Sequence, residues 1–191
     1  MTKYNLIGGA FDFDETLVES IKAITTLVNK EFGFNVSWDS VHRYNFEDAY
    51  PSIPKNEILK YFETDEFFNI LTIKPNTIET LYTLNSLGYF LKIVTIGTAK
   101  NLAKKKEWIN QNILPFVPIQ TIGIERESSE MGKGCVDLKG YLLLDDHQTN
   151  LMTSNATVKV LYRNIENASW NNLWVGRFVT DIIECIKYFE R

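Results

Sequence analysis

The sequence predicts an α/β fold, a doubly wound parallel sheet with a small helical segment inserted after the first strand. Two observations support the sheet: short apolar runs alternate with helical patterns over most of the chain, and three of these runs end in carboxylate or hydroxyl residues. A third observation supports the insert. Between the first and second apolar runs lies a stretch that is rich in aromatic residues and has no strand pattern.

The composition is that of one globular core with room for a small appended unit. The chain has 191 residues, of which 45% are hydrophobic and 23% charged. A formal charge of −4 argues against a surface for nucleic-acid polymers and is compatible with a small substrate and a metal ion. Cys135 and Cys185 have no metal-site spacing. We expect a cytoplasmic protein, because Asp12 interrupts the only candidate export segment and no run is long enough to span a membrane.

The chain begins with a predicted buried strand over residues 5–11, apolar apart from Asn5. A helix follows, which Gly33 can end in a left-handed turn. Four of its apolar residues fall at helical spacing: Ile21, Ile24, Val28 and Phe32.

The stretch from about residue 37 to 73 is predicted to form two to four short helices. Pro54 can open one of them and Thr64 can cap another. Eight aromatic side chains crowd this stretch: Trp38, Tyr44, Phe46, Tyr50, Tyr61, Phe62, Phe67 and Phe68. We therefore expect two units, a core of residues 1–18 and 75–191 and a helical insert of residues 19–74.

The remainder of the chain alternates regularly, as a parallel sheet requires. Predicted helices cover residues 77–87, 99–113 and 181–189, the last with a capping-box start at Asp181 and Glu184. Predicted strands cover residues 89–95, 119–124, 141–144 and 157–162. The polar residues 125–134 are expected to form an exposed loop, and residues 164–172 a second loop.

Acidic and hydroxyl side chains lie where three of the predicted strands end. Asp12 and Asp14 follow the first strand, Thr95 closes the second, and Asp145 and Asp146 close the fourth. In a parallel sheet these ends share one edge, which is where open α/β sheets bind ligands. Four carboxylates there would repel one another unless a hard divalent cation lay among them, and oxygen ligands select Mg²⁺. Taken alone, Asp14 or Thr16 could instead cap the helix that follows.

These motifs resemble those of the haloacid-dehalogenase-like (HAD) phosphohydrolase superfamily. Its DxDxT motif matches Asp12, Asp14 and Thr16, its strand-closing hydroxyl matches Thr95 in KIVT, and its acidic pair matches the end of YLLLDD. The resemblance covers essentially the whole chain. It implies a Rossmann-like core with the first strand at its centre, a cap formed by the insert, and a phosphoaspartate mechanism that uses Mg²⁺.

The resemblance also implies a role for each motif residue. Asp12 would attack phosphorus, and Asp14 would protonate the leaving oxygen and then activate water. Mg²⁺ would be held by Asp12, the Asp14 carbonyl and Asp145 or Asp146. Thr95 would bind a phosphoryl oxygen, and Thr16 and Gly97 are expected among the substrate-binding residues.

A lysine completes the site in this superfamily by offsetting charge near the nucleophile. Lys105 is our prediction, because it and Trp108 in KKEW resemble a K-x-x-W found at this point in one branch. Lys133, in GKG before the fourth strand, is the alternative.

That branch is the 5′(3′)-deoxyribonucleotidase-like group, which implies a (deoxy)nucleoside monophosphate as substrate and a homodimer as the expected assembly. In that group the cap aromatics form a nucleobase pocket, and Trp38, Tyr44 and Phe46 are the residues we expect there. The other aromatic residues of the insert are expected to fill its core.

One position departs from that branch. Glu15 stands where these nucleotidases carry glycine, and DFDETLV resembles the carboxy-terminal-domain phosphatases instead. Thr95 follows Asp12 by 83 positions, which leaves room for a cap that those phosphatases lack here. A general phosphatase of sugar phosphates or phosphoamino acids stays open, as do a phosphomutase and a binding module without turnover.

Overall fold

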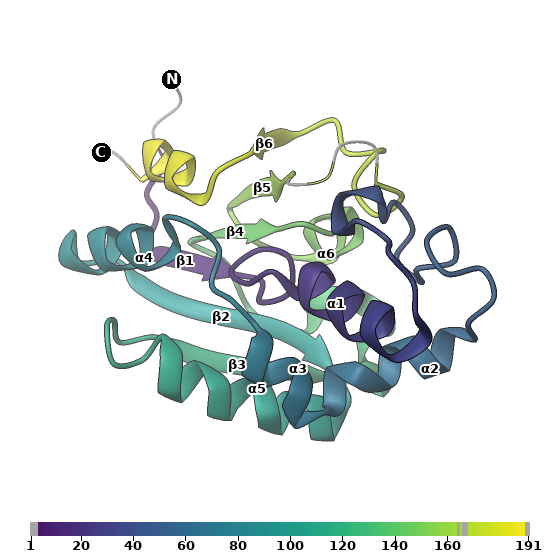
Figure 1. Ribbon diagram of the computed structural model, residues 1–191. Helices are drawn as coiled ribbons and strands as arrows, with labels where there is room; N and C mark the ends of the chain where they lie inside the picture. The colour runs from purple at the N-terminus through teal and green to yellow at the C-terminus, as the bar shows by residue number, and fades with distance from the viewer. Residues whose placement is uncertain (1–3, 164, 166–167, 190–191) are drawn as a thin grey trace.

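A six-stranded sheet forms the centre of the protein (Figure 1). Neighbouring strands pair in parallel, as predicted, but the sheet has one strand more than the five expected. The computed structural model describes residues 4–163, 165 and 168–189, and of residues 127–131 the backbone alone. The sheet order is β3-β2-β1-β4-β5-β6. The strands are β1 (Gly8–Phe11), β2 (Phe90–Gly97), β3 (Gln120–Glu125), β4 (Tyr141–Asp145), β5 (Val158–Tyr162) and β6 (Arg177–Val179).

Helices cover both faces of this sheet. The α-helices are α1 (Ser20–Phe32), α2 (Lys55–Leu59), α3 (Asp65–Ile70), α4 (Thr77–Ser86), α5 (Ala99–Asn112) and α6 (Gln148–Thr153). The 3₁₀ helices are η1 (Trp38–Ser40), η2 (Lys60–Glu63), η3 (Arg126–Cys135) and η4 (Ile182–Tyr188). Residues of α4, α5 and η4 belong to the larger apolar cluster, whereas Leu151 of α6 belongs to a smaller cluster on the opposite face.

The central strand β1 is short and completely buried. Its side chains alternate between the two faces, so that Phe11 joins the larger cluster and Ala10 the smaller one. Gly8 pairs with Phe90 and Tyr141 in the two neighbouring strands, and a Cβ at this position would clash with the Phe90 carbonyl oxygen. The tight packing of β1 fixes where the chain emerges at the carboxyl edge of the sheet.

The segment between β1 and β2 is helical, and Figure 1 shows α1 and α2 beyond the carboxyl ends of the strands. Its aromatic and aliphatic residues continue the larger core cluster, including Tyr50, Ile58 and Phe67. The chain enters and leaves this segment side by side, since Val18 bridges to Ile73. The division into a core and an insert of residues 19–74 stays a prediction.

Several element predictions are confirmed in detail. Gly33 ends α1 in the left-handed conformation (φ 72°), and the Thr64 side chain caps α3. The capping box of Asp181 and Glu184 opens the closing helix, which is a 3₁₀ helix rather than an α-helix. Among the described residues, no helix is long and apolar enough to cross a membrane.

Two element predictions were wrong. Residues 126–135 form the 3₁₀ helix η3 instead of an exposed loop, and Lys133 in it is completely buried. The strand β6 lies within a stretch for which no strand was expected, because its three residues carry no usable periodicity. The second predicted loop, 164–172, falls partly outside the described residues.

Candidate active site

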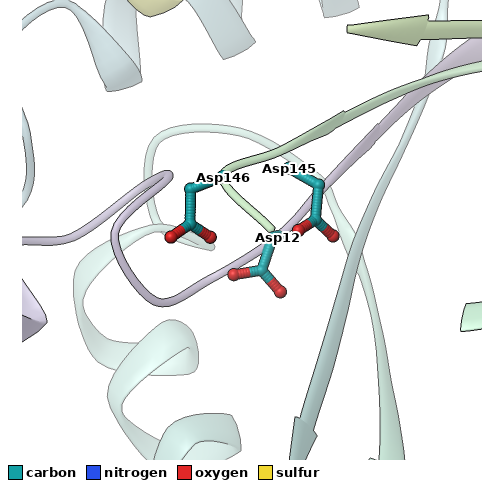
Figure 2. A group of neighbouring side chains, drawn as sticks. All are labelled: Asp12, Asp145 and Asp146. Carbon is teal, nitrogen blue, oxygen red and sulfur yellow. The ribbon is translucent and has the colours of Figure 1, made fainter. Parts of the chain in front are cut away.

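Three carboxylates from two neighbouring strands meet at the carboxyl edge of the sheet. Asp12 directly follows β1, Asp145 is the last residue of β4, and Asp146 comes next. Ligand oxygens of all three lie within 4.8 Å of one another, and all three residues are buried. Figure 2 shows this group of side chains. The juxtaposition follows from the parallel pairing of β1 with β4, which the Asp12 N–H to Leu144 carbonyl bond (2.9 Å) extends.

Burial makes the ionised form of these carboxyls costly. It raises the pKa of Asp12 to about 7, with Asp145 and Asp14 raising it further and Lys133 opposing them. Burial also raises the pKa of Asp146 well above its usual range, and Asp12 and Asp145 add to this shift. A buried cluster of acidic oxygens with one ammonium beside it fits a divalent cation, which would stabilise the ionised carboxylates.

Lys133 supplies that ammonium. Its Nζ donates to Asp12 Oδ1 and to Asp145 Oδ2 (2.6 Å for the second), and its side chain is completely buried. The polar sequence around Lys133 gave no sign that this residue turns inward. The ion pairs with Asp12 and Asp145 explain why a lysine is tolerated there.

The loop that carries the acidic pair is fixed by hydrogen bonds. Asp145 Oδ1 accepts from the His147 backbone N–H (2.9 Å) and from the Asn150 side chain (3.0 Å). Asp146 N–H donates to Thr16 Oγ1 (3.2 Å), so the hydroxyl of the DxDxT motif joins the β1 loop to the β4 loop.

Asp14 lies apart from the three-carboxylate group. Its carboxylate accepts from Ser20 Oγ (2.7 Å) and from Lys105 Nζ, and 29% of its side chain is exposed. Lys105 also donates to Thr95 Oγ1 (2.9 Å) and to the Ile96 carbonyl (3.1 Å), which accounts for its three N–H donors. Lys105 therefore orients Asp14 and Thr95, and Lys133 is the lysine that contacts Asp12.

A cavity of about 670 Å³ opens over these groups and is lined in part by residues of the helical segment between β1 and β2. Most of the predicted site residues line it: Asp12, Asp14, Lys105, Asp146, Tyr44 and Phe46.

The other predicted substrate-binding residues do not line this cavity. Thr16 is completely buried against the β4 loop, and Gly97 packs so closely on Asn101 of α5 that a Cβ would clash with its side chain. Trp38 of η1 is 37% exposed elsewhere. Thr95 is also absent from the lining, since it is buried beneath Lys105.

The structure adds cavity residues that the sequence did not indicate. His147 and Trp170 line the cavity beside Tyr44, whose ring lies edge-on to both at centroid distances of 5.6 and 6.5 Å. The His147 Nδ1 accepts from the Thr149 backbone N–H (3.3 Å), and burial lowers the pKa of His147. Adjacency to Asp146 was the available signal for His147.

Comparison of the sequence with protein families gives one match over nearly the whole chain. Residues 5–177 match the family described as 5′ nucleotidase, deoxy (pyrimidine), cytosolic type C protein. The chain belongs to this family. No curated protein matched the sequence individually.

Solved structures show the same fold at low sequence identity. A predicted phosphatase from Clostridium acetobutylicum is 15% identical, with a TM-score of 0.62, and the match covers 98% of this chain and 99% of that one. A HAD-superfamily hydrolase, subfamily IA, variant 1, from Geobacter sulfurreducens PCA is 13% identical, with a TM-score of 0.61 and full coverage of both chains.

A third structure, a HAD family hydrolase from Deinococcus radiodurans R1, was solved with bound phosphate and sodium. It is 17% identical to this chain, with a TM-score of 0.61 and coverage of 95% and 94%. The family match together with the fold makes this protein a HAD phosphohydrolase, a phosphoric monoester hydrolase.

Proposed function

We propose that this protein is a Mg²⁺-dependent phosphomonoesterase that acts through an aspartyl phosphate and releases phosphate from (deoxy)nucleoside monophosphates. The observation that carries the proposal is Asp12, a buried carboxylate at the floor of a cavity, beside two further carboxylates and an ammonium. The family match supports a nucleotide as the substrate.

The residues present fit a divalent cation. Asp12 and Asp146 both line the cavity, and Asp145 lies within ligand range of both. Oxygen-only ligands favour Mg²⁺, which when bound would neutralise charge on the phosphate and on the nucleophile. The side chain of Asp14 takes no part in this group, so in the proposal only its backbone carbonyl would serve as a ligand.

Asp12 is the proposed nucleophile. Its carboxylate forms a bond to phosphorus as the bond to the leaving oxygen breaks, and water then cleaves the aspartyl phosphate. Lys133 contacts this carboxylate directly and two of its three N–H donors go to Asp12 and Asp145. We therefore assign Lys133, in place of Lys105, as the lysine that offsets charge at the nucleophile.

Asp14 is the proposed acid and base. It lines the cavity two residues after the nucleophile, and hydrogen bonds from Ser20 and Lys105 fix its carboxylate. Protonated Asp14 would give its proton to the leaving oxygen and would later take one from the attacking water. Thr95 accepts a bond from Lys105 and does not line the cavity, so in the proposal it holds Lys105 in place beside Asp14.

The remainder of the cavity suits the rest of a nucleotide. Its volume of about 670 Å³ lies within the range of small-molecule sites. Tyr44, His147 and Trp170 form an aromatic wall on which a planar base could stack, a contact worth about 1–3 kcal/mol. Arg43 and Lys55 add positive charge from the insert, which suits an anionic substrate.

The test is phosphate release from a panel of deoxy- and ribonucleoside monophosphates and common sugar phosphates, with Mg²⁺ and with a chelator. We expect Mg²⁺-dependent turnover, highest on nucleotides, and a loss of more than about a thousandfold in Asp12→Asn, which keeps the shape of the nucleophile. Preference for sugar phosphates would contradict the substrate assignment. No Mg²⁺-dependent turnover on any member would contradict the proposed activity.

A further inference from the structure

Glu15 occupies an unusual place in the nucleophile loop. It directly follows Asp14 and adopts the left-handed conformation (φ 55°), which is costly for a residue other than glycine. Its side chain turns inward: Oε1 accepts from the Ile21 backbone N–H in the first turn of α1 (2.6 Å). A strained backbone together with a buried charge indicates that this side chain is held in place by its surroundings.

The Glu15 carboxylate also reaches across to the far end of the insert. Its Oε2 lies 3.2 Å from Lys74 Nζ, and each of the two side chains is only 7% exposed. The Lys74 ammonium also lies 5.7 Å from the centre of the Tyr162 ring of β5. Lys74 is the first residue after the Val18–Ile73 bridge, and its own N–H donates to the Leu17 carbonyl (2.9 Å).

The pair therefore joins three parts of the protein at one point: the loop of Asp12 and Asp14, the start of α1, and the chain leaving the insert. We infer that Glu15 and Lys74 are positioning residues. Their ion pair fixes the position of Asp14 relative to Asp12, and it makes that position depend on how the insert packs against the core. The inference rests on the proposed phosphatase function for its kinetic readout. It also explains why this chain carries glutamate where glycine was expected.

Glu19 offers a control for Glu15, because it is a second glutamate that joins the two ends of the insert. Glu19 Oε2 accepts from Thr72 Oγ1 (2.6 Å) and from Lys22 (2.9 Å), so Glu19 also joins the two connecting segments, but at the surface and without contact to the nucleophile loop. Comparison of Glu15 with Glu19 separates an effect on the loop from a general loosening of the insert.

The experiment measures kcat, KM and thermal stability for Glu15→Gln, Lys74→Met, Lys74→Arg and Glu15→Gln/Lys74→Met, with Glu19→Gln as the control. Each single loss of charge removes the ion-pair partner of a buried charge and should lower stability, and the double variant should recover much of it. We expect kcat to fall about ten- to hundredfold in Glu15→Gln, in Lys74→Met and in the double variant, with KM within about threefold. Lys74→Arg should restore most of kcat.

Two kinetic outcomes would overturn the inference. One is recovery of kcat along with stability in the double variant, which is what a merely structural pair predicts. The other is a fall of kcat in Glu19→Gln as large as in Glu15→Gln.

A readout without turnover keeps the inference separate from the proposed function. Amide hydrogen exchange over residues 12–21 should quicken about tenfold in Lys74→Met and stay unchanged in Glu19→Gln, even if the wild type hydrolyses nothing. Inactivity of the wild type would then count against the phosphatase proposal alone, whereas unchanged exchange in Lys74→Met would count against the pair.

Discussion

At the scale of single residues, the proposed nucleophile and the proposed acid each contact a different lysine. Lys133 contacts Asp12 and Asp145, and Lys105 contacts Asp14 and Thr95. A nucleophile and a proton donor need different surroundings, and a separate ammonium beside each lets the two differ. Removal of Lys133 and removal of Lys105 should therefore change kcat in different ways.

Substrates with poor and good leaving groups distinguish the two roles. Lys133→Met should lower kcat by at least about a hundredfold on a nucleotide and on p-nitrophenyl phosphate alike, because attack by Asp12 is impaired. Lys105→Met should be comparably slow on the nucleotide, since Asp14 is misplaced, but should lose less than about tenfold on p-nitrophenyl phosphate, whose leaving group needs little protonation. Steady-state kinetics on both substrates measure this. Equal losses of Lys105→Met on both would contradict the division.

The sequence predicted which residues lie near the candidate site better than it predicted the direction of their side chains. Asp12, Asp14, Asp145 and Asp146 were predictable because carboxylates at the ends of parallel strands must share an edge. Thr16 matched its motif, yet its hydroxyl serves the Asp146 N–H instead of the cavity. Which way a side chain points depends on contacts with residues far away in the sequence, and these leave no local pattern.

At the scale of elements, the sheet was predictable where strands are apolar and several residues long. The strands β1, β2 and β4 show such runs, and the acidic residues at the ends of β1 and β4 fall where predicted. Thr95 does not close its strand as predicted, because β2 continues to Gly97. The helix η3 was not predictable, because the two ion pairs that allow Lys133 to be buried come from β1 and β4. The strand β6 is too short to carry a period of its own.

The packing of β1 against β2 gives a prediction at this scale. Gly8→Ala should lower the free energy of unfolding by about 1–3 kcal/mol, because the added methyl group meets the Phe90 carbonyl and the Tyr141 ring within a closely packed sheet. Chemical denaturation measures the change. Phe90→Thr is the control: it alters the residue paired with Gly8, but at a side chain that is 69% exposed, and should change stability by less than about 0.5 kcal/mol. A Gly8→Ala protein as stable as the wild type would contradict the close approach of these strands.

At the scale of the whole molecule, ionisation of the buried carboxyls lowers stability, and a bound cation would offset this cost. Folding raises the pKa of Asp12 from the usual carboxyl range to about 7, so the folded protein holds a proton that the unfolded chain has lost. The contribution of Asp12 to stability is therefore fully present below about pH 4 and is lost as the pH rises towards 7. The raised pKa of Asp146 acts in the same direction.

Mg²⁺ binding should reverse this loss, because the cation binds the ionised carboxylates and competes with their protons. We expect the rise in melting temperature on addition of Mg²⁺ to be small at pH 5.5 and to grow steadily to pH 8, as measured by thermal unfolding with Mg²⁺ and with a chelator. Asp12→Asn removes a carboxylate that must lose its proton, so this variant should show a smaller Mg²⁺ effect and a flatter pH dependence of its metal-free stability. Subtraction of the two pH profiles isolates Asp12 from His147, whose lowered pKa acts in the opposite direction. A Mg²⁺ effect of equal size at pH 5.5 and pH 8 would contradict the link between the carboxylate cluster and the cation.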